Sequence, residues 1–565
     1  MLKQVGEIYS WIPNAHIRVL TKGEGLQAAE NMENSNEQIE SQPQFHTFGA
    51  CEIEILRSFC LIIFGASGDL AKRKLMPALY HLFEDGLLPD NFFIFCTDRI
   101  EMNIEQYREL IKDALESALP RDFKPSGWLK FAKRLYYSPF NYTDMDSYKI
   151  DLKKRLPSLE KRHGTDGNRV FYLAIPPTIL ENVIINIGET GLSVEENGYS
   201  HIVIEKPFGR SFETARNLNN VLKKYFEEKQ IFRIDHYVAK ETVQNMLMFR
   251  FANSILEPLW NRRYIDHIQI TASEMLGVEH RAGYYEEAGV IRDMFQSHMF
   301  QLLAVTAMEP PAAFKADYVR DEKIKVFRSM RPFPTERLND FIAIGQYGKG
   351  TINGKPVAGY REEPGVSPKS ITPTFAAMKV FIDNWRWNGV PFYLRSGKRL
   401  PVRKTEISIH YKQVPHMMFS KVMDEIIEPN VLVFRLQPEE GISLTFQTKK
   451  PGTKVCLNPI QMDFSYQKDV FLDAYEWVLL DCILGDQMLF LRQEGVEETW
   501  SLLTPAIENL ETTTEVTNFP NYSTGSSGPD EARLLIEKDG RTWKPLIAEK
   551  PDESIHITRL RGHKP

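Results

Sequence analysis

The stretch SFCLIIFGASGDLA, residues 58–71, decides the fold. Residues 58–64 form an apolar run of strand length, and a glycine turn and a predicted helix over about 70–84 follow it directly. Gly65 permits the sharp turn, Gly68 lets backbone amides approach a pyrophosphate, and Ala71 lets the helix pack closely on the strand. The stretch therefore predicts a dinucleotide-binding unit, with a purely structural tight turn as the alternative.

Further short apolar strands follow on the C-terminal side of this unit. They are predicted at residues 92–95, 170–173, 201–204 and 231–234, with a helix over 104–118 and other helical stretches between them. Strands that alternate with helices are typical of a doubly wound parallel sheet. We therefore predict a Rossmann-like α/β domain over residues 55–235.

The pattern changes after residue 235. Helices are predicted over 238–252 and 287–307, and the predicted strands lie at 265–271, 341–346, 378–381, 407–411, 431–436 and 442–447. Apolar and polar residues alternate along the later strands, which indicates a large, mostly antiparallel sheet with one buried face. We expect an α+β domain over 236–550, used for substrate binding and oligomerisation. A disordered leader over 1–54 and a mobile tail over 551–565 complete the predicted organisation.

Composition excludes several classes of protein. The chain has 565 residues, 42% of them hydrophobic, and a formal charge of −6, so a general attraction to nucleic acid or to an anionic membrane is not expected. No apolar run approaches the roughly 18 residues that a membrane span needs. The five cysteines are scattered without a CxxC pair, which predicts neither a metal site nor a disulfide framework. A soluble protein of the reducing cytoplasm fits best.

The residues after the second predicted strand bear on the choice of cofactor. Arg99 can bind a 2′-phosphate with its planar guanidinium, supported by Ser67 and by a basic residue such as Lys74, whereas Asp98 would repel that phosphate and accept a hydrogen bond from a ribose 2′-hydroxyl. The two neighbours therefore favour different cofactors. A solvated loop charge is the alternative for Arg99.

Two polar clusters follow later strands, where doubly wound folds place their ligands. Lys206 lies in EKPFG, residues 205–209, and is either a ligand-binding cation or a surface residue. In RIDHYVAKE, residues 233–241, His236 and Lys240 are four residues apart on one face of a predicted helix, with Tyr237 beside them. This cluster predicts a phosphate site, and the alternative is a capped helix with a solvated face.

The segment GVIRDMFQSH, residues 289–298, places Asp293 and His298 in a largely apolar helix. On a regular α-helix five residues turn through about 140°, so the two would not share a face and His298 would need a carboxylate from elsewhere. A lone histidine there is more often a core residue. Residues 395–404 carry five cations, which form either a solvated run or an anion clamp beside a cleft.

From about Ser58 to about Trp543 the chain resembles the glucose-6-phosphate dehydrogenase family. Seven motifs occur in the family's order and spacing: GASGDLAKRK, FYLAIPP, EKPFG, RIDHYVAKE, GVIRDMFQSH, RSGKRL and TKKPG. The combination of EKPFG with RIDHYxxKE is close to diagnostic. The resemblance implies NADP-dependent oxidation of glucose 6-phosphate at C1 to the 1,5-lactone, the first step of the oxidative pentose phosphate pathway, without a metal.

The resemblance also implies the role of each site residue. His298 matches the general base that takes the proton of the C1 hydroxyl, and Asp235 matches the carboxylate that pairs with it. The residues that match the 6-phosphate ligands are His236, Tyr237 and Lys240. Those that match contacts to the sugar are Lys206, Glu274, Asp293, Lys398 and, more loosely, Arg403. Lys206 is also expected near the nicotinamide, after a peptide bond to Pro207 that is often cis in the family.

The expected NADP contacts are Gly65, Ala66, Ser67, Gly68, Asp69, Leu70, Lys74, Arg99, Ala174 and Lys206, with NAD as a possible secondary cofactor because of Asp98. Eukaryotic members bind a second, structural NADP. Here Ser443, Thr445 and Ser527 replace the Tyr, Lys and Arg of that site, although Arg395, Lys404 and Arg435 remain. The family forms dimers through its large sheet, so a homodimer or homotetramer is expected. The alternatives are a catalytically silent NADP-binding partner protein and a broader hexose-6-phosphate dehydrogenase.

Overall fold

The computed structural model describes residues 56–235, 237, 241–416, 418, 427–449, 451–452, 457–465 and 473–547. All of them belong to one compact unit of the chain. The leader predicted over 1–54 and the tail predicted over 551–565 lie outside the described residues, as do His236 and Lys240. No helix in the described part is long and apolar enough to cross a membrane.

A six-stranded parallel sheet forms from the residues predicted to be doubly wound, in the order β3-β2-β1-β4-β5-β6. Its strands are β1 (Phe59–Phe64), β2 (Phe92–Asp98), β3 (Leu135–Pro139), β4 (Arg169–Leu173), β5 (Ser200–Ile204) and β6 (Ile231–Arg233). β1 pairs with β2 on one side and with β4 on the other. The direction in which successive strands are added to the sheet therefore reverses beside β1. Ligands bind at the carboxyl ends of the strands beside such a reversal. The predicted fold class of this part is confirmed.

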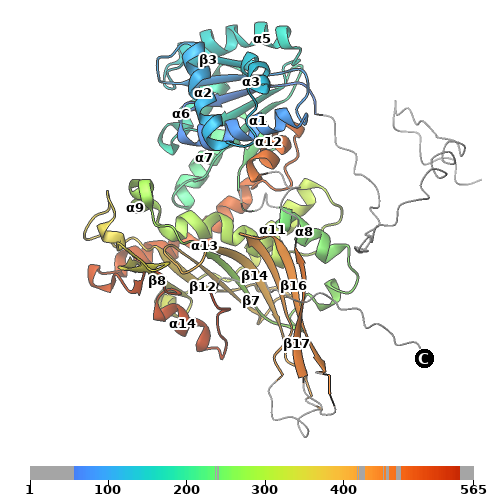
Figure 1. Cartoon of the computed structure of the whole chain (residues 1–565), viewed down its shortest axis with the longest axis vertical. Helices are drawn as coiled ribbons and strands as arrows, with labels where there is room; N and C mark the ends of the chain where they lie inside the picture. The colour runs from blue at the N-terminus through green and yellow to red at the C-terminus, as the bar shows by residue number, and fades with distance from the viewer. Residues whose placement is uncertain are drawn as a thin grey trace, which may run out of the picture. The chain divides into compact units, whose positions relative to one another are not determined.

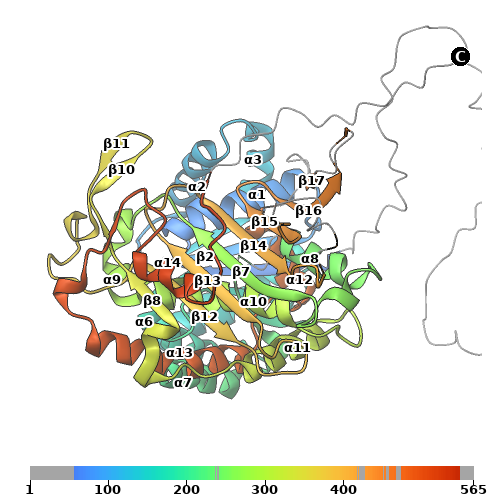
Figure 2. The ribbon, with the colours of Figure 1, turned by 90° about the horizontal axis from the view of Figure 1, so that it is seen from below.

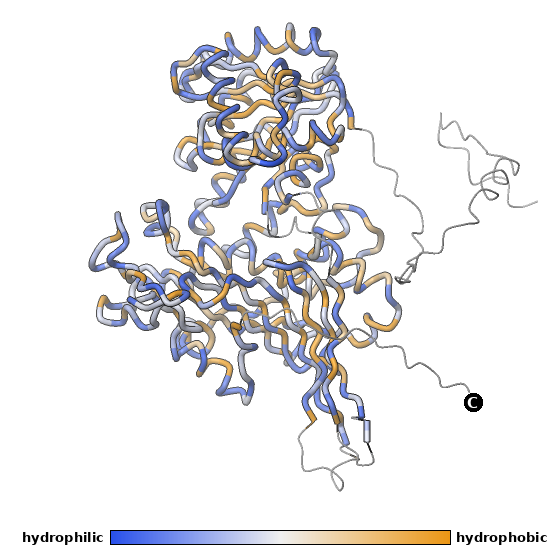
Figure 3. Tube along the Cα trace, viewed as in Figure 1, coloured by the Kyte–Doolittle hydropathy of each residue, from blue (hydrophilic) through white to orange (hydrophobic). Residues whose placement is uncertain are grey.

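Both faces of this sheet are buried, which explains why its strands are continuous apolar runs. In β1 the residues Cys60, Ile62 and Phe64 belong to one core, and the alternate residues of the strand belong to a second core on the opposite face. Helices lie on both faces (Figure 1), and the apolar strands are visible in Figure 3. The helices are α1 (Met76–Glu84), α2 (Ile104–Ala118), α3 (Pro125–Phe131), α5 (Leu156–His163), α6 (Pro177–Glu189) and α7 (Phe212–Tyr225).

An eight-stranded sheet forms the second part, in the order β17-β16-β15-β14-β7-β13-β12-β8, and Figure 2 shows its central strands side by side. Its strands are β7 (Ile265–Ser273), β8 (Ile342–Gly345), β12 (Phe375–Phe381), β13 (Pro391–Gly397), β14 (Lys404–Tyr411), β15 (Val431–Gln437), β16 (Gly441–Lys449) and β17 (Leu457–Ser465). Only β7 and β13 pair in parallel, so the predicted mostly antiparallel sheet is confirmed.

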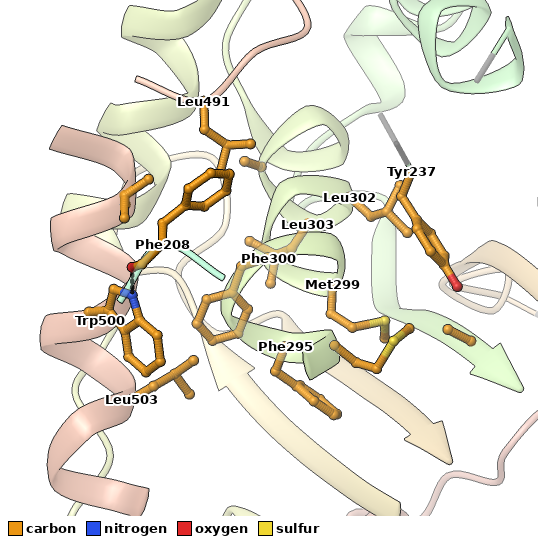
Figure 4. Packing of buried hydrophobic residues seen from close by; sticks show 14 of the residues in the cluster. Phe208, Tyr237, Phe295, Met299, Phe300, Leu302, Leu303, Leu491, Trp500 and Leu503 are labelled. Carbon is orange, nitrogen blue, oxygen red and sulfur yellow. Dashed lines mark hydrogen bonds between the residues drawn. The ribbon is translucent and has the colours of Figure 1, made fainter. Parts of the chain in front are cut away.

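The helices of the second part are α8 (Glu241–Phe251), α9 (Ala282–Val290), η7 (Ile291–Met299), α10 (Phe300–Ala307), α11 (Ala316–Ser329), α12 (Ala474–Leu484), α13 (Gln493–Thr513) and α14 (Asp530–Glu537). Figure 4 shows η7 and α10 between α13 and Tyr237. Trp500 of α13 donates a hydrogen bond of 2.9 Å from Nε1 to the carbonyl of Phe208, just after β5. Two segments that are distant in sequence are thereby fixed against the helix that carries His298.

Some elements differ from the sequence prediction. The helix predicted over 287–307 is interrupted at Gly289, where φ is 60° and ψ 174°, and continues as the π-helix η7. The strands β3, β13 and β17 are additional to the predicted ranges. Leu135–Pro139 has no long apolar run, and β17 is an exposed edge strand with Pro459 inside it, where an edge strand tolerates proline. Helix α12, which is late in the chain, packs against α1 of the first sheet.

Candidate active site

The turn after β1 is shaped for the close approach of a ligand to the backbone. Gly65 has a φ of 83°, and a Cβ atom at this position would lie 2.2 Å from the carbonyl oxygen of Ala174 at the end of β4. Only glycine therefore fits between the two neighbouring strand ends. The turn closes through a hydrogen bond of 3.0 Å from the Gly68 amide to the Gly65 carbonyl. This geometry fits the pyrophosphate-binding turn that the sequence predicts.

Asp98, the last residue of β2, is bound to the same turn. Its Oδ2 accepts hydrogen bonds from Ser67 Oγ at 2.6 Å and from the Ser67 amide at 3.0 Å, and its Oδ1 accepts from the Arg99 amide at 2.7 Å. Ser67, which we expected to assist Arg99 with a phosphate, is thus a donor to Asp98. The Arg99 side chain is exposed at the end of the strand. Asp69 pairs with Arg73 at 2.8 Å, and Lys74 lies 3.9 Å from Asp473.

A buried histidine and carboxylate form the centre of the site. His298 Nδ1 and Asp235 Oδ1 are 2.5 Å apart, and both side chains are completely inaccessible to solvent. Asp235 lies two residues after the end of β6, and its Oδ1 also accepts a hydrogen bond of 2.9 Å from the Tyr237 amide. The Tyr237 ring stacks on the imidazole with 4.2 Å between the centroids. The imidazole is therefore fixed in orientation, with Nε2 as its remaining polar atom.

The separation expected for Asp293 and His298 on a regular α-helix does not apply, because their helix is not regular; the carboxylate that His298 was predicted to need from elsewhere is Asp235. Both residues lie in η7, a π-helix, whose wider turn brings residues i and i+5 closer in direction than an α-helix does. Lys206 Nζ consequently contacts both, at 2.6 Å from His298 Nε2 and 3.1 Å from Asp293 Oδ1. It also donates to the Asp293 carbonyl oxygen at 2.9 Å. The peptide bond between Lys206 and Pro207 is cis, as the resemblance implied.

The ends of β7 and β13 supply a second lysine and carboxylate. Lys398, just after β13, forms an ion pair with Glu274, just after β7, and lies over the ring of Tyr285 at 5.1 Å from its centroid. These two strands are parallel neighbours, so their carboxyl ends meet at one edge of the sheet. The Lys398 ammonium also acts on Asp293. Arg403 is exposed and donates to Gln437 Oε1 at 2.9 Å.

Electrostatics set the protonation states of the cluster. Burial lowers the pKa of His298 below its usual value; Asp235 opposes this effect and Lys206 adds to it. For Asp293, burial is outweighed by the cations Lys206 and Lys398, and the pKa is held well below the usual range. At neutral pH the site therefore combines a neutral His298 imidazole with an ionised Asp293 carboxylate, which suits proton abstraction from a hydroxyl.

Sequence reasoning did not identify two tyrosines of this cluster. Tyr284 donates a hydrogen bond of 3.2 Å to Asp293 Oδ1, and Tyr285 lies beneath Lys398. The pair YY directly before the acidic EE of α9 was the only available signal.

The three cations expected from a eukaryotic second-cofactor site have protein partners here. Arg395 stacks on Trp543, Lys404 pairs with Glu406 at 3.0 Å, and Arg435 pairs with Asp463 at 2.8 Å.

The site contains no feature of a metal centre within the described ranges, where no group of three or more His, Cys, Asp or Glu side chains could hold an ion.

Nearly the whole described chain matches known proteins. Residues 62–245 match the NAD binding domain of glucose-6-phosphate dehydrogenase, and residues 247–544 match the C-terminal domain of the same family.

Relatives named glucose-6-phosphate 1-dehydrogenase cover most of the chain. The protein from Chlamydia pneumoniae is 44% identical over 497 residues, which are 86% of this chain and 96% of the relative. The protein from Aggregatibacter actinomycetemcomitans is 43% identical and covers 86% of this chain and 97% of the relative. A solved structure of glucose-6-phosphate dehydrogenase in complex with its substrate glucose 6-phosphate is 34% identical, with a TM-score of 0.79 over 88% of this chain and all of that one. This chain belongs to the glucose-6-phosphate dehydrogenase family.

Proposed function

We propose that the protein oxidises D-glucose 6-phosphate at C1 to 6-phospho-D-glucono-1,5-lactone with NADP as acceptor, in the cytoplasm, as the entry step of the oxidative pentose phosphate pathway. One observation carries this proposal: the buried hydrogen bond between His298 and Asp235, with Lys206 at the opposite imidazole nitrogen, in a member of this family. Residues 55–235 are the NADP-binding domain and residues 236–550 are the substrate-binding domain.

His298 acts as the general base. Asp235 accepts a hydrogen bond from Nδ1–H, which fixes the tautomer in which Nε2 carries the free electron pair. Nε2 then takes the proton of the C1 hydroxyl, and the carboxylate stabilises the imidazolium that forms. Because the pKa of His298 is lowered, the imidazole is neutral at neutral pH and its Nε2 carries no proton.

Lys206 has two roles, one before and one after the substrate binds. Its ammonium donates to His298 Nε2 at 2.6 Å, in the position that the C1 hydroxyl must occupy as the proton donor. Substrate binding therefore moves Lys206 from Nε2, while Asp293 retains it through the contacts at 2.9 and 3.1 Å. Lys206 is then placed to donate to a sugar hydroxyl. The remaining sugar contacts come from Glu274, Asp293 and Lys398. Arg403 contributes a further cation at the edge of the site.

The 6-phosphate is held by Tyr237 together with His236 and Lys240, which follow β6. The ring of Tyr237 stacks on the imidazole of His298. A residue that binds the phosphate therefore also contacts the catalytic base, so phosphate binding is coupled to the alignment of C1. Phosphate binding at this position supplies the energy that orients the sugar for reaction. The preference for the phosphorylated sugar over free glucose follows from these contacts.

The residues for NADP are those of the turn after β1 and the ends of β2 and β4: Gly65, Ala66, Ser67, Gly68, Asp69, Leu70, Lys74, Arg99 and Ala174. The space that a side chain at Gly65 would fill supports their fit to a dinucleotide. The bound nicotinamide supplies the hydride acceptor. Arg99 favours the 2′-phosphate of NADP, and Asp98 leaves room for secondary use of NAD.

A homodimer or homotetramer forms through the large sheet. Cross-strand pairs of β16 and β17 place the residues Ile442, Leu444, Phe446, Ile460, Met462 and Phe464 on one face, where Ile442 and Leu444 pack on the core of the chain itself and Phe446, Met462 and Phe464 are exposed. Met462 is 61% exposed and Phe464 51% exposed, on an edge strand. A contiguous apolar face of this kind is typical of a protein interface, and a second copy of the chain is its occupant.

Initial rates with glucose 6-phosphate and with glucose, each with NADP and with NAD, test the function. We expect the highest kcat/KM for glucose 6-phosphate with NADP. Formation of 6-phosphogluconolactone should accompany NADPH in equal amounts. A chain that binds NADP but turns over neither sugar would instead be a silent homologue, and equal efficiency with several hexose 6-phosphates would indicate the broader enzyme.

A further inference from the structure

Helix α9 brings a tyrosine hydroxyl to the carboxylate of Asp293. The half-buried Tyr284 donates a hydrogen bond of 3.2 Å from Oη to Asp293 Oδ1, and Lys206 Nζ contacts the same oxygen at 3.1 Å. Asp293 itself is only 5% exposed. Both hydrogen bonds that the described residues give to this carboxylate therefore end on Oδ1, and Oδ2 is the oxygen that remains for a ligand.

The backbone at Gly289 makes this contact possible. Tyr284 and Asp293 are nine residues apart, and the helix is interrupted between them at Gly289, where φ is 60° and ψ 174°. The next amide, that of Val290, donates a hydrogen bond of 2.9 Å to the carbonyl of Pro373. The chain thus changes direction at Gly289, and α9 folds back beside the first turns of η7.

Hydrogen bonds from the loop before β12 fix α9 in place. Glu286, two residues after Tyr284, accepts at Oε1 from the hydroxyls of Tyr360 and Ser370, each at 2.6 Å. Thr372 Oγ1 donates to the Glu286 carbonyl oxygen at 3.1 Å. The Tyr284 hydroxyl is consequently carried by an anchored helix, so it is a fixed point against which a carboxylate can be oriented.

The protonation states suit a lasting contact. Burial, together with the charge of Asp293, raises the pKa of Tyr284, so the phenol keeps its proton at neutral pH. The cations Lys206 and Lys398 hold the pKa of Asp293 well below its usual range, so the carboxylate stays an acceptor. A hydrogen bond from a neutral hydroxyl to an ionised carboxylate is charge-assisted and stronger than one between neutral groups.

We propose that Tyr284 is a positioning residue: its hydroxyl fixes the rotation of the Asp293 carboxylate, so that Oδ1 holds Lys206 and Oδ2 is left for a sugar hydroxyl. This inference rests on the proposed function of Lys206 and Asp293. When the substrate displaces Lys206 from His298 Nε2, the contact to Oδ1 determines where the ammonium goes. Tyr284 acts on the reaction through Asp293 and does not touch the reacting atoms.

The test is a double-mutant cycle on kcat for glucose 6-phosphate with NADP, built from Tyr284→Phe, Asp293→Ala and their combination. Tyr284→Phe removes one oxygen atom and keeps the ring, so kcat should fall about three- to tenfold, the effect of one lost hydrogen bond. The Kd for glucose 6-phosphate should change by less than about twofold, because the phosphate contacts remain. In the Asp293→Ala background the same substitution should alter kcat by less than about twofold, since the carboxylate through which it acts is absent.

Tyr225→Phe is the matched control. Tyr225 is also half-buried, and its hydroxyl also donates to a carboxylate, Glu189 Oε1 at 2.5 Å. It is the last residue of α7, which runs from the carboxyl end of β5 back toward the amino end of β6, away from the site. This variant should retain the kcat of the wild type. Melting temperatures identify a temperature at which every variant is folded, and the rates are compared there.

A Tyr284→Phe enzyme with wild-type kcat would overturn the inference, as would an equal loss of kcat in the Asp293→Ala background or in Tyr225→Phe. A rise of Kd in proportion to the fall of kcat would also contradict it, because that pattern indicates general distortion of the site. Should Tyr284→Phe or Asp293→Ala fail to fold, Tyr284→Met or Asp293→Asn takes its place with the same expectations. Absence of activity in the wild type would contradict the proposed function itself, so the two failures are distinguishable.

Discussion

Asp293 and His298 are five residues apart and contact the same ammonium group, that of Lys206, at 3.1 and 2.6 Å. This is possible because residues 291–299 form a π-helix, in which positions i and i+5 are close in direction. The proposed general base, the proposed sugar-binding carboxylate and the lysine between them therefore need only two segments of the chain. The widened turn is the feature of the backbone on which the catalytic arrangement depends.

The first prediction concerns the pH dependence of the wild type. Because burial and Lys206 lower the pKa of His298, the base stays deprotonated as the pH falls through 6.5, and activity should be lost only below that value. The substrate phosphate has its own second pKa of about 6, which would obscure this limb. The profile of kcat/KM should therefore also be measured with free glucose, which lacks that group. An acidic limb of the kcat/KM profile with its midpoint above pH 6.5 for both sugars would contradict the neutral form that we assign to His298.

Cofactor choice should depend on Asp98 and Arg99. Arg99→Ala should weaken NADP binding by at least about tenfold with little effect on NAD, because a charge-assisted contact to the 2′-phosphate is lost. Asp98→Ala should raise the preference for NADP, since a carboxylate near that phosphate is removed. Asp98→Asn is the matched variant: it keeps an acceptor for the Ser67 amide without the charge. Normal NADP binding by Arg99→Ala would contradict the assignment.

The glycine turn can be tested with a matched pair of substitutions. Gly65 and Gly86 both have positive φ, at 83° and 69°, but only a Cβ at Gly65 would collide with Ala174, whereas none lies near Gly86. Gly86→Ala should lower stability by about 1 kcal/mol from backbone strain and leave NADP affinity unchanged. Gly65→Ala should in addition weaken NADP binding by more than about tenfold. Melting temperature and NADP titration measure the two effects separately, and equal NADP affinity in both variants would be the contrary result.

Assembly through the large sheet predicts a specific sensitivity. Met462→Asp places a charge in the apolar face of β16 and β17 and should dissociate the oligomer, because an unpaired charge is costly in an interface. Leu129→Asp is the control, since Leu129 is 66% exposed and lies on α3, which belongs to the parallel sheet rather than to the large one. Sedimentation velocity at micromolar concentration distinguishes the species. An unchanged sedimentation coefficient for Met462→Asp would place the interface elsewhere.

Much of the first sheet could be predicted, because a strand buried on both faces is a continuous apolar run and its turn requires glycine at position 65. The helix over 104–118 has the predicted bounds, since its spacing is regular and Asn103 caps it. The strand β17 could not be predicted in the same way. Its residues are mostly exposed, so its position depends on pairing with β16 rather than on its own burial.

The site was predictable only in part. Asp235 and His298 were identifiable through the family motifs, whereas helical spacing alone placed Asp293 and His298 on different faces. Local periodicity assumes a regular helix, and nothing in residues 291–299 signals the wider turn. Tyr284 has no motif, and its relation to the site arises from the packing of α9 against η7 in three dimensions.

The central claim is that His298, held by Asp235, removes the proton from the sugar. Its most direct test is kcat for glucose 6-phosphate in His298→Asn, with Asp235→Asn measured beside it. We predict that kcat of His298→Asn falls by about 10²–10⁴-fold while the Kd for glucose 6-phosphate stays nearly unchanged, and that Asp235→Asn loses less. A His298→Asn enzyme that retains near-normal kcat would contradict the account.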